Sequence, residues 1–257
     1  MVDKREQILM SKLRIKRKLE LREAENLLNV SESTARRLFL KLEKEGKLIR
    51  IHGGVRLLEK NPLEYSFERV AKSRMEEKSK IGSKACEMLK DGDVIFCDTG
   101  TTILCFCMEL RNRMEESPLD IRVYTNSLAN FEALAPSVPI TLLGGEYRPN
   151  RRDFAGYLTE LSMLKIHFTK CFIGTDGCDL KNHYFMTTDF DTARMDEIAI
   201  RNTDEIMILC DSDKFNNCEQ VGFVEFSQVN KIVTDARIRL EIQKKLEEEG
   251  VEVILTE

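Results

Sequence analysis

From residue 77 onward, short apolar runs alternate with stretches that have helical character. Seven such runs occur, at residues 93–98, 121–126, 139–145, 170–177, 205–211, 231–235 and 251–257. Strands that alternate with helices are typical of a parallel sheet whose two faces are both covered. The pattern therefore predicts an α/β domain with a mostly parallel sheet over residues 77–257.

Polar turns follow the apolar runs, at the points where strands of this sheet would end. Ligands of such sheets bind at the carboxyl ends of the strands. A glycine and threonine hydroxyls at the start of a helix leave backbone amides available for an anion. The candidate ligand-binding residues are Asp98, Gly100, Thr101, Thr102, Thr125, Asn126, Ser127, Gly144, Gly145, Asp176, Gly177 and Lys214. Each turn alone is a common structural feature, but together they predict a pocket for a small, anionic, hydroxyl-rich ligand such as a sugar phosphate.

Residues 1–57 have a different pattern, with three expected helices. The first covers about residues 3–18, the second residues 21–28, and the third starts after Ser31, a good N-cap, and ends at Gly46. In the third helix, residues 35, 38, 39 and 42 form one apolar stripe. Two short strands around His52-Gly53-Gly54 would follow, because paired glycines supply the positive φ angles of a tight hairpin. Three helices and a basic hairpin predict a winged helix-turn-helix.

A winged helix-turn-helix places one helix in the major groove of DNA and its wing near phosphates or the minor groove. The candidate DNA-contacting residues are Ser31, Ser33, Thr34, Arg36, Arg37, Lys41, Arg50, His52, Gly53, Gly54 and Arg56. Helix-turn-helix shapes also serve as protein-interaction modules, which is the alternative for this segment. Charge favours DNA: residues 1–60 hold 16 Lys and Arg against 9 Asp and Glu, whereas the rest of the chain holds 24 against 35.

The run VSESTARRLFLKLEKEGKLIRIHGGV resembles the DNA-binding motif of the DeoR family of bacterial transcription regulators. The residues shared with that motif are Val30, Ser31, Thr34, Arg36, Arg37, Leu42, Glu43, Gly46, Arg50, His52, Gly53 and Gly54. The chain departs from the motif at Ala35, Leu38 and Phe39, where the family has Ile, Asp and Leu. The resemblance implies a DNA-binding role, and the lost Asp makes the operator sequence less transferable.

The resemblance continues over nearly the whole chain, in DTGTT, TNS, LLGGEYR, SDKF and KIVTDARI. It implies a sensor domain with a ribose-phosphate-isomerase-like fold and a phosphorylated sugar as effector. By the same resemblance, residues 100–102 would contact the phosphate, and Asp98, Asn126, Asp176 and Lys214 would line the rest. Thr192 and Asp196 stand where the family has Glu and Lys. That exchange puts the identity of the sugar in doubt.

We therefore expect a sequence-specific repressor with a DNA-binding domain at residues 1–57, a linker at 58–76 and a sensing and oligomerisation domain at 77–257. Double-stranded operator DNA and a small phosphorylated metabolite are the expected partners. One winged head makes few base contacts, so a homo-oligomer, dimer or tetramer, is expected. The N-terminal segment is too charged for a signal peptide, and no apolar run is long enough for a membrane helix. The expected location is the cytoplasm.

Two other functions are compatible with parts of the sequence. The first is an isomerase-like enzyme with an accessory nucleic-acid-binding head, because Asp98, Asp176 and Lys214 are suited to acid-base catalysis on a sugar phosphate. The second alternative is a DNA-binding protein whose C-terminal domain serves only for oligomerisation. No catalytic triad, metal cluster or cofactor motif stands out, and the eight cysteines are expected to be structural. Neither a catalytic site nor a cofactor is expected.

Overall fold

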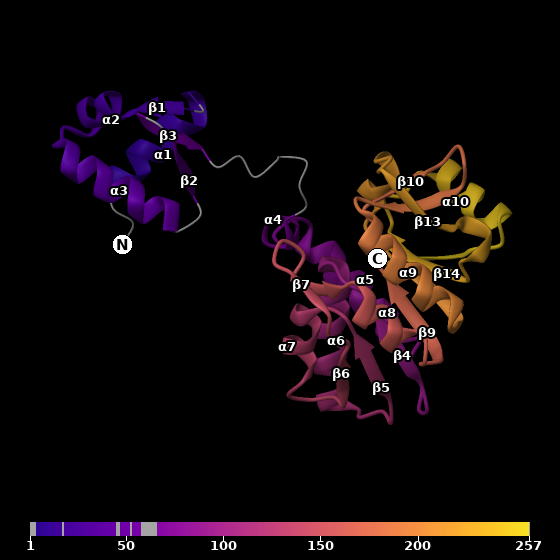
Figure 1. The fold of residues 1–257 in the computed structure, drawn as a ribbon. Coiled ribbons are helices and arrows are strands. Elements are labelled where there is room, and N and C mark those ends of the chain that lie inside the picture. Colours follow the sequence, from indigo (N-terminus) through magenta and orange to yellow (C-terminus); the bar gives the residue numbers. More distant parts are fainter. Residues whose placement is uncertain (1–3, 17, 45–46, 52, 58–65, 257) are drawn as a thin grey trace. The chain divides into compact units, whose positions relative to one another are not determined.

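The computed structural model describes residues 4–16, 18–44, 47–51, 53–57 and 66–256. The chain divides into two compact units, Met1–Glu64 and Tyr65–Glu257, called the head and the body (Figure 1). The segment predicted as a linker, residues 58–76, includes a short helix of the body, α4 (Phe67–Ala71), and the start of the next one. The predictions for Gly46 and His52 lie outside the described residues.

In the head, three helices pack on a small antiparallel sheet with the strand order β1-β3-β2. The elements are α1 (Lys4–Lys16), β1 (Lys18–Glu20), α2 (Leu21–Leu28), α3 (Glu32–Lys44), β2 (Leu48–Ile51) and β3 (Gly54–Leu57). Their shared core includes Leu9, Leu13, Phe39 and Leu42, all of them buried. The predicted winged helix-turn-helix is thereby confirmed. Strand β1, which is only three residues long, was not predicted.

The two described glycines of the wing have different reasons to be glycine. Gly53 has a φ of +80°, which side-chain-bearing residues rarely adopt, and it lies in the turn between β2 and β3. A Cβ on Gly54 would stand 2.2 Å from the Leu19 carbonyl oxygen of β1. Gly53 therefore permits the turn, and Gly54 permits the third strand to pair with the hairpin.

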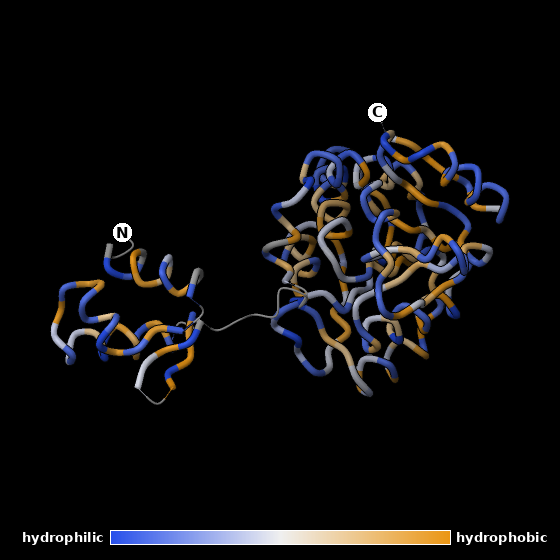
Figure 2. Tube along the Cα trace, turned by 90° about the horizontal axis from the view of Figure 1, so that it is seen from above, coloured by the Kyte–Doolittle hydropathy of each residue, from blue (hydrophilic) through white to orange (hydrophobic). Residues whose placement is uncertain are grey.

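Within the described part of the body, seven parallel strands form one sheet with the order β15-β14-β12-β9-β4-β5-β6. They are β4 (Val94–Cys97), β5 (Arg122–Thr125), β6 (Ile140–Leu142), β9 (Phe168–Ile173), β12 (Thr203–Leu209), β14 (Lys231–Asp235) and β15 (Glu252–Thr256). Each overlaps one of the seven predicted apolar runs. Figure 2 shows hydrophobic and hydrophilic segments alternating along the chain of the body. The predicted α/β body with a mostly parallel sheet is confirmed.

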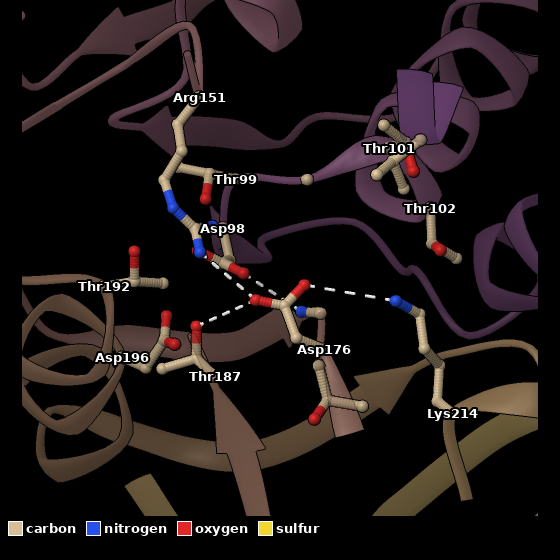
Figure 3. Close-up of a pocket in the computed structure, with 14 residues that line it drawn as sticks. Asp98, Thr99, Thr101, Thr102, Arg151, Asp176, Thr187, Thr192, Asp196 and Lys214 are labelled. Atoms are coloured by element: carbon tan, nitrogen blue, oxygen red, sulfur yellow. Dashed lines mark hydrogen bonds and ion pairs between the residues drawn. The ribbon is translucent and has the colours of Figure 1, made fainter. Parts of the chain in front are cut away.

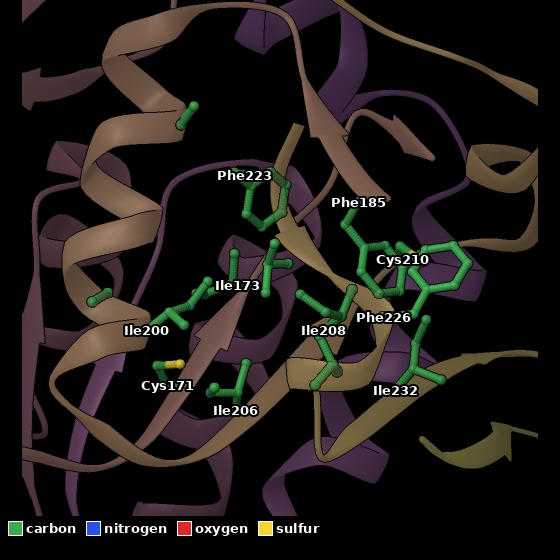
Figure 4. Close-up of a cluster of buried hydrophobic side chains, with 14 of the residues drawn as sticks. Cys171, Ile173, Phe185, Ile200, Ile206, Ile208, Cys210, Phe223, Phe226 and Ile232 are labelled. Carbon is green, nitrogen blue, oxygen red and sulfur yellow. The ribbon is translucent and has the colours of Figure 1, made fainter. Parts of the chain in front are cut away.

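Both faces of this sheet are covered, as the continuous apolar strands require. Successive side chains of a strand point to opposite faces. On β12, Ile206 and Ile208 join one hydrophobic core while Met207 and Leu209 join the other. The first core also contains side chains from β9, β11, β13 and α9 (Figure 4). Seven of the eight cysteines are buried, in agreement with a structural role.

Helices and short strands complete the body around the sheet. The helices are α4, α5 (Met75–Cys86), α6 (Thr101–Glu116), α7 (Leu128–Leu134), α8 (Tyr157–Met163), α9 (Phe190–Arg201) and α10 (Leu240–Glu248), with 3-10 turns η1 (Ser212–Asn216) and η2 (Phe226–Gln228). The short strands β7 (Glu146–Arg148) and β8 (Asp153–Ala155) form a ribbon, and β10 (Gly177–Asp179), β11 (Tyr184–Thr187) and β13 (Val221–Glu225) form a small antiparallel sheet.

Candidate functional site

The strand order creates a crevice between β4 and β9. From β4 the chain adds β5 and β6 on one side, and then returns to add β9, β12, β14 and β15 on the other. The connections that leave β4 and β9 therefore run in opposite directions along the sheet. Parallel sheets bind ligands at such a switch point, outside the carboxyl ends of the strands.

A cavity lies at this point (Figure 3). Its lining residues are Val70, Asp98, Thr99, Gly100, Thr101, Thr102, Arg151, Gly174, Thr175, Asp176, Thr187, Thr192, Asp196 and Lys214. Six of the twelve candidate ligand-binding residues are among them: Asp98, Gly100, Thr101, Thr102, Asp176 and Lys214. They come from three separate strand ends, as the sequence pattern predicts.

The start of α6 supplies one wall of the cavity. Gly100 precedes the helix with φ +104° and ψ 165°, and a Cβ there would meet no atom within 4 Å. The glycine is therefore required by its backbone angles rather than by crowding. Thr101 and Thr102 begin the helix and are buried. The first amides of a helix have no partner within it and carry a partial positive charge, so this wall suits an anion.

Asp176 lies between the two cations of the cavity. Its carboxylate is 3.2 Å from the Arg151 guanidinium and 4.0 Å from the Lys214 ammonium. The same carboxylate accepts a hydrogen bond of 3.1 Å from the Thr187 hydroxyl. Arg151 also pairs with Asp189 at 2.7 Å. The Lys214 side chain remains 19% exposed, which leaves its ammonium group accessible to a ligand.

The carboxyl groups of Asp98 and Asp196 lie on the side of the cavity away from Lys214 in Figure 3. Asp98 follows β4 and accepts a hydrogen bond of 3.1 Å from the Gly174 amide, whereas Asp196 projects from α9. Burial raises the pKa of Asp98 to about 6. Burial and the nearby Asp98 carboxylate raise the pKa of Asp196 well above its ordinary value. The two carboxyl groups also hydrogen-bond to each other, so the pair holds a proton more readily than separate carboxyl groups would.

The other six candidate ligand-binding residues lie outside this cavity, and several have evident local roles. The Thr125 hydroxyl donates to the Cys97 carbonyl, and the Ser127 hydroxyl caps α7 by accepting from the Asn130 amide. The Asn126 amide group donates to the Phe154 carbonyl. The cavity also excludes Gly144, Gly145 and Gly177. At Gly145 and Gly177 neighbouring atoms would lie within 2.5 Å of an added Cβ, so both positions need glycine for packing.

Several lining residues were not predicted. Arg151 follows β7, and Thr187 ends β11, short strands that the run of seven apolar segments does not reveal. Thr192 and Asp196 were singled out only as departures from the family pattern. The four-residue spacing of Thr192 and Asp196 on α9 was a usable signal, because residues at i and i+4 share one face of a helix.

Helix α4 contributes Val70 to the cavity and is held firmly to the body. Phe67 is buried, and its amide donates to the Asn150 carbonyl at 2.9 Å. The buried Lys78 ammonium donates to the Val70 and Ser73 carbonyls at 2.8 and 2.7 Å. Burial lowers the pKa of Lys78. The segment that leaves the head therefore enters the body at an element that lines the cavity.

In the head, α3 buries the predicted stripe of Ala35, Leu38, Phe39 and Leu42 and exposes its polar face. Ser31 precedes the helix, and its carbonyl accepts from the Thr34 and Ala35 amides. Thr34, Arg37 and Lys41 line one shallow hollow of the surface. Ser33 and Arg36 are exposed beside them, and Arg50, Gly53 and Arg56 are exposed on the wing, with Gly54 half-buried.

The cations of this surface differ in their partners. Arg36 pairs with Glu32 at 2.7 Å, and Arg50 pairs with Glu43 at 2.6 Å. Lys41 is 3.1 Å from the buried Glu6, which also pairs with Lys47. Those two lysines lower the pKa of Glu6, Lys47 more strongly. Arg37 has no carboxylate partner in the described part of the head, so it is the arginine of α3 most available to DNA.

The fold and these two sites define a DNA-binding regulator with a ligand-sensing body. Two family models match the chain, the DeoR-like helix-turn-helix domain at residues 5–61 and the DeoR C terminal sensor domain at residues 73–236. The chain belongs to the DeoR family of transcription regulators.

Two relatives are named lactose phosphotransferase system repressors. The one from Lactococcus lactis subsp. lactis is 33% identical, over 90% of this chain and 89% of that protein. The one from Streptococcus mutans is 34% identical, over 84% of this chain and 85% of that protein. These names are those of transcriptional repressors, which confirms the prediction that the chain is not an enzyme.

Among solved structures, ribose 5-phosphate isomerase A from Methanocaldococcus jannaschii is similar at a TM-score of 0.43 and 23% identity, over 56% of this chain and 55% of that one. None of the described helices is long and apolar enough to cross a membrane.

Proposed function

We propose that the protein is a repressor whose affinity for operator DNA is set by a phosphorylated sugar bound in the body. The observation that carries the proposal is the cavity at the β4–β9 switch point. It combines the first amides of α6, two threonine hydroxyls and the partly exposed Lys214 ammonium. Amides and a cation together match a phosphate group, and the remaining polar wall matches the hydroxyls of a sugar.

The proposed DNA contacts are the exposed polar residues of α3 and the wing. Arg37 would contact a base edge, because it is exposed and has no carboxylate partner among the described residues of the head. Arg36, Arg50 and Arg56 would contact phosphates, for which exact geometry matters less. Breaking the pairs with Glu32 and Glu43 costs little, since exposed ion pairs contribute only about 0–1 kcal/mol.

Coupling between the two sites would pass through α4. A ligand in the cavity contacts Val70, and Val70 belongs to the helix that follows the segment leading from the head. A ligand alters DNA affinity only if it binds one arrangement of the protein more tightly than another. We propose that the position of α4 differs between those arrangements and that effector binding releases the operator.

The repressor would act as a homo-oligomer assembled through the body. Five large apolar side chains are exposed on α8, just after it and at the start of α9: Tyr157, Leu158, Leu161, Leu164 and Phe190 are 72%, 65%, 38%, 52% and 78% exposed. The two helices contact one another, with Arg194 and Glu160 paired at 3.1 Å. An exposed apolar patch is typical of an interface, and two heads on repeated half-sites give the specificity that one lacks.

Selection of bound sequences from random duplex DNA with the full-length protein tests the proposal. The selected operator is then titrated with the protein alone and with each of a panel of hexose and pentose phosphates. A salt-sensitive, sequence-specific complex that at least one sugar phosphate dissociates is the expected result. The unphosphorylated sugars are the matched controls. The proposal is refuted if the protein binds no duplex DNA. It is also refuted if no sugar phosphate changes operator binding and no sugar phosphate binds to the body.

A further inference from the structure

The turn between β7 and β8, residues 149–152, contacts the cavity on one side and α4 on the other. Within this β7–β8 turn, the Arg151 side chain lines the cavity (Figure 3). The carbonyl oxygen of the preceding residue, Asn150, accepts a hydrogen bond of 2.9 Å from the Phe67 amide. The guanidinium carbon of the following residue, Arg152, is 5.7 Å from the centre of the Phe67 ring. Three consecutive residues thus connect the cavity to the first residue of α4.

The β7–β8 turn is held to the body at its base and at its last residue. Arg148, which ends β7, pairs with the buried Asp153, which begins β8, at 2.6 Å. The Arg152 carbonyl accepts a hydrogen bond of 2.9 Å from the Leu128 amide at the start of α7. Because these ends are held, the conformation of the turn depends on the contacts that Arg151 makes inside the cavity.

Arg151 is itself held by two carboxylates. Its Nε atom is 2.7 Å from Asp189, and a terminal nitrogen is 3.2 Å from Asp176. Asp176 in turn lies 4.0 Å from Lys214, the cation assigned to the phosphate of the effector. A phosphate beside Lys214 brings negative charge close to the Asp176 carboxylate, which it repels and can replace as a partner of the cations. A guanidinium group donates in a fixed fork, so a change at one carboxylate alters its orientation toward the other.

We infer that Arg151 is the positioning residue that communicates an occupied cavity to α4: an anionic effector changes the contact of Arg151 with Asp176, and the β7–β8 turn transmits the shift to Phe67. This inference rests on the proposed function, because it assumes that an anionic effector enters the cavity and that α4 changes position. It adds a second contact between the cavity and α4, at the opposite end of the helix from the carbonyl groups that Lys78 holds.

Arg152→Met tests the inference in the full-length protein, because it removes the cation above the Phe67 ring and lies outside the cavity lining. The probe is the panel of hexose and pentose phosphates, and the ester that weakens wild-type operator binding most is used with every variant. A cation over an aromatic ring corresponds to about two- to fivefold in an equilibrium constant. The effect of the ester on operator affinity should fall by that factor. Affinity for the ester, measured by calorimetry, and for the operator without ester should both stay at the wild-type value.

Glu132→Gln is the matched control. Arg152 also pairs with Glu132 of α7 at 2.5 Å, and this change removes the pair while it leaves the ring contact in place. The effect of the ester should therefore remain as in the wild type. Phe67→Leu keeps a buried apolar side chain but removes the ring, so it should give the same loss as Arg152→Met. Because the two changes remove one contact, the double variant should lose no more than either single variant.

Arg151→Lys tests the end of the turn that faces the cavity. A lysine keeps the positive charge but cannot hold two carboxylates in the fixed geometry of a guanidinium group. At saturating ester, the effect on operator affinity should fall by about fivefold or more. Operator affinity without ester should be unchanged, since the substitution lies in the body.

The inference and the proposed function can fail separately. If an ester weakens wild-type operator binding and does so as fully in Arg152→Met, Phe67→Leu or Arg151→Lys, the inference is wrong and the proposed function stands. The inference is also wrong if Glu132→Gln loses as much of the effect as Arg152→Met, because the ring contact is then not the cause. If no sugar phosphate binds to the wild type or changes its operator binding, the proposed function fails and the inference fails with it.

Discussion

The head and the body carry their polar groups in opposite environments. In the head, Arg36 is 60% exposed and Arg37 also faces solvent. In the body, the cavity groups Asp98, Thr101 and Asp196 are each less than 5% exposed. A long polyanion can be held only by charges that project from a surface, and each such contact contributes little. A small ligand can be surrounded by buried groups, each of which contributes much because water does not screen it.

The head and the body should differ most strongly in how their binding depends on salt concentration. Raising the salt from about 50 to 200 mM should weaken operator binding by about a hundredfold or more, given a slope of about 0.9 per neutralised phosphate and at least about four phosphates. Effector binding should change far less, because buried groups are screened little. Fluorescence anisotropy for DNA and calorimetry for the effector measure both. If operator binding and effector binding depend equally on salt, the two regions do not differ in how their charged groups are screened.

Lys214→Met should affect the body alone. Losing a charged donor to the phosphate should weaken binding of a sugar phosphate by about 10- to 100-fold. Operator affinity without effector should be unchanged. Lys84→Met removes a half-exposed lysine from α5 and serves as the control, with no expected effect on either activity. Wild-type effector affinity in Lys214→Met would remove Lys214 from the proposed site.

Arg37→Ala should affect the head alone. Loss of a base contact should weaken operator binding by about 1–3 kcal/mol and reduce discrimination at one position. Arg36→Ala should cost less, because Arg36 already pairs with Glu32. Competition with variant operators distinguishes the two, and effector affinity should be unchanged in both. If Arg36→Ala weakens operator binding more than Arg37→Ala does, Arg36 contacts the base and Arg37 does not.

Lys78→Met tests the link between the regions. Without the bonds from its ammonium to the Val70 and Ser73 carbonyls, α4 should lose its fixed position. DNA and effector should still bind, but the effector should change operator affinity by less than about twofold rather than by the 5- to 150-fold of typical coupling. Operator titrations with and without effector measure this ratio. Full coupling in the variant would argue against a route through α4.

Asp196→Asn should give the smallest effect, a gain in stability of the body. A carboxyl whose pKa is raised by folding keeps its proton in the folded state, while the unfolded chain loses its own above about pH 4. Asp196 therefore lowers stability increasingly as the pH rises beyond that value. The variant should raise the melting temperature by more at pH 8 than at pH 5. Asp191→Asn should show no such trend.

Much of the fold was predictable because its signals are local. Apolar runs locate all seven strands of the main sheet, and residues 21–28 form the predicted helix. The site was predictable only in part. Asp98 and Lys214 follow strands and were identified. Arg151 follows a three-residue strand and Thr187 ends a four-residue strand, and neither strand has a periodic pattern. Short strands form through tertiary pairing, and the sequence around them carries little signal.

The sequence by itself determined the class of protein: a basic winged head, an α/β body and the family to which both belong. Only the tertiary structure decided how the polar turns are used. It brought Asp98 and Asp176 to one cavity and left Thr125 and Ser127 as internal supports, since strand order decides which turns become neighbours. It also placed Asp98 and Asp196 face to face from segments far apart in the chain. That meeting, and the burial that raises the pKa of both carboxyls, has no counterpart in the linear pattern.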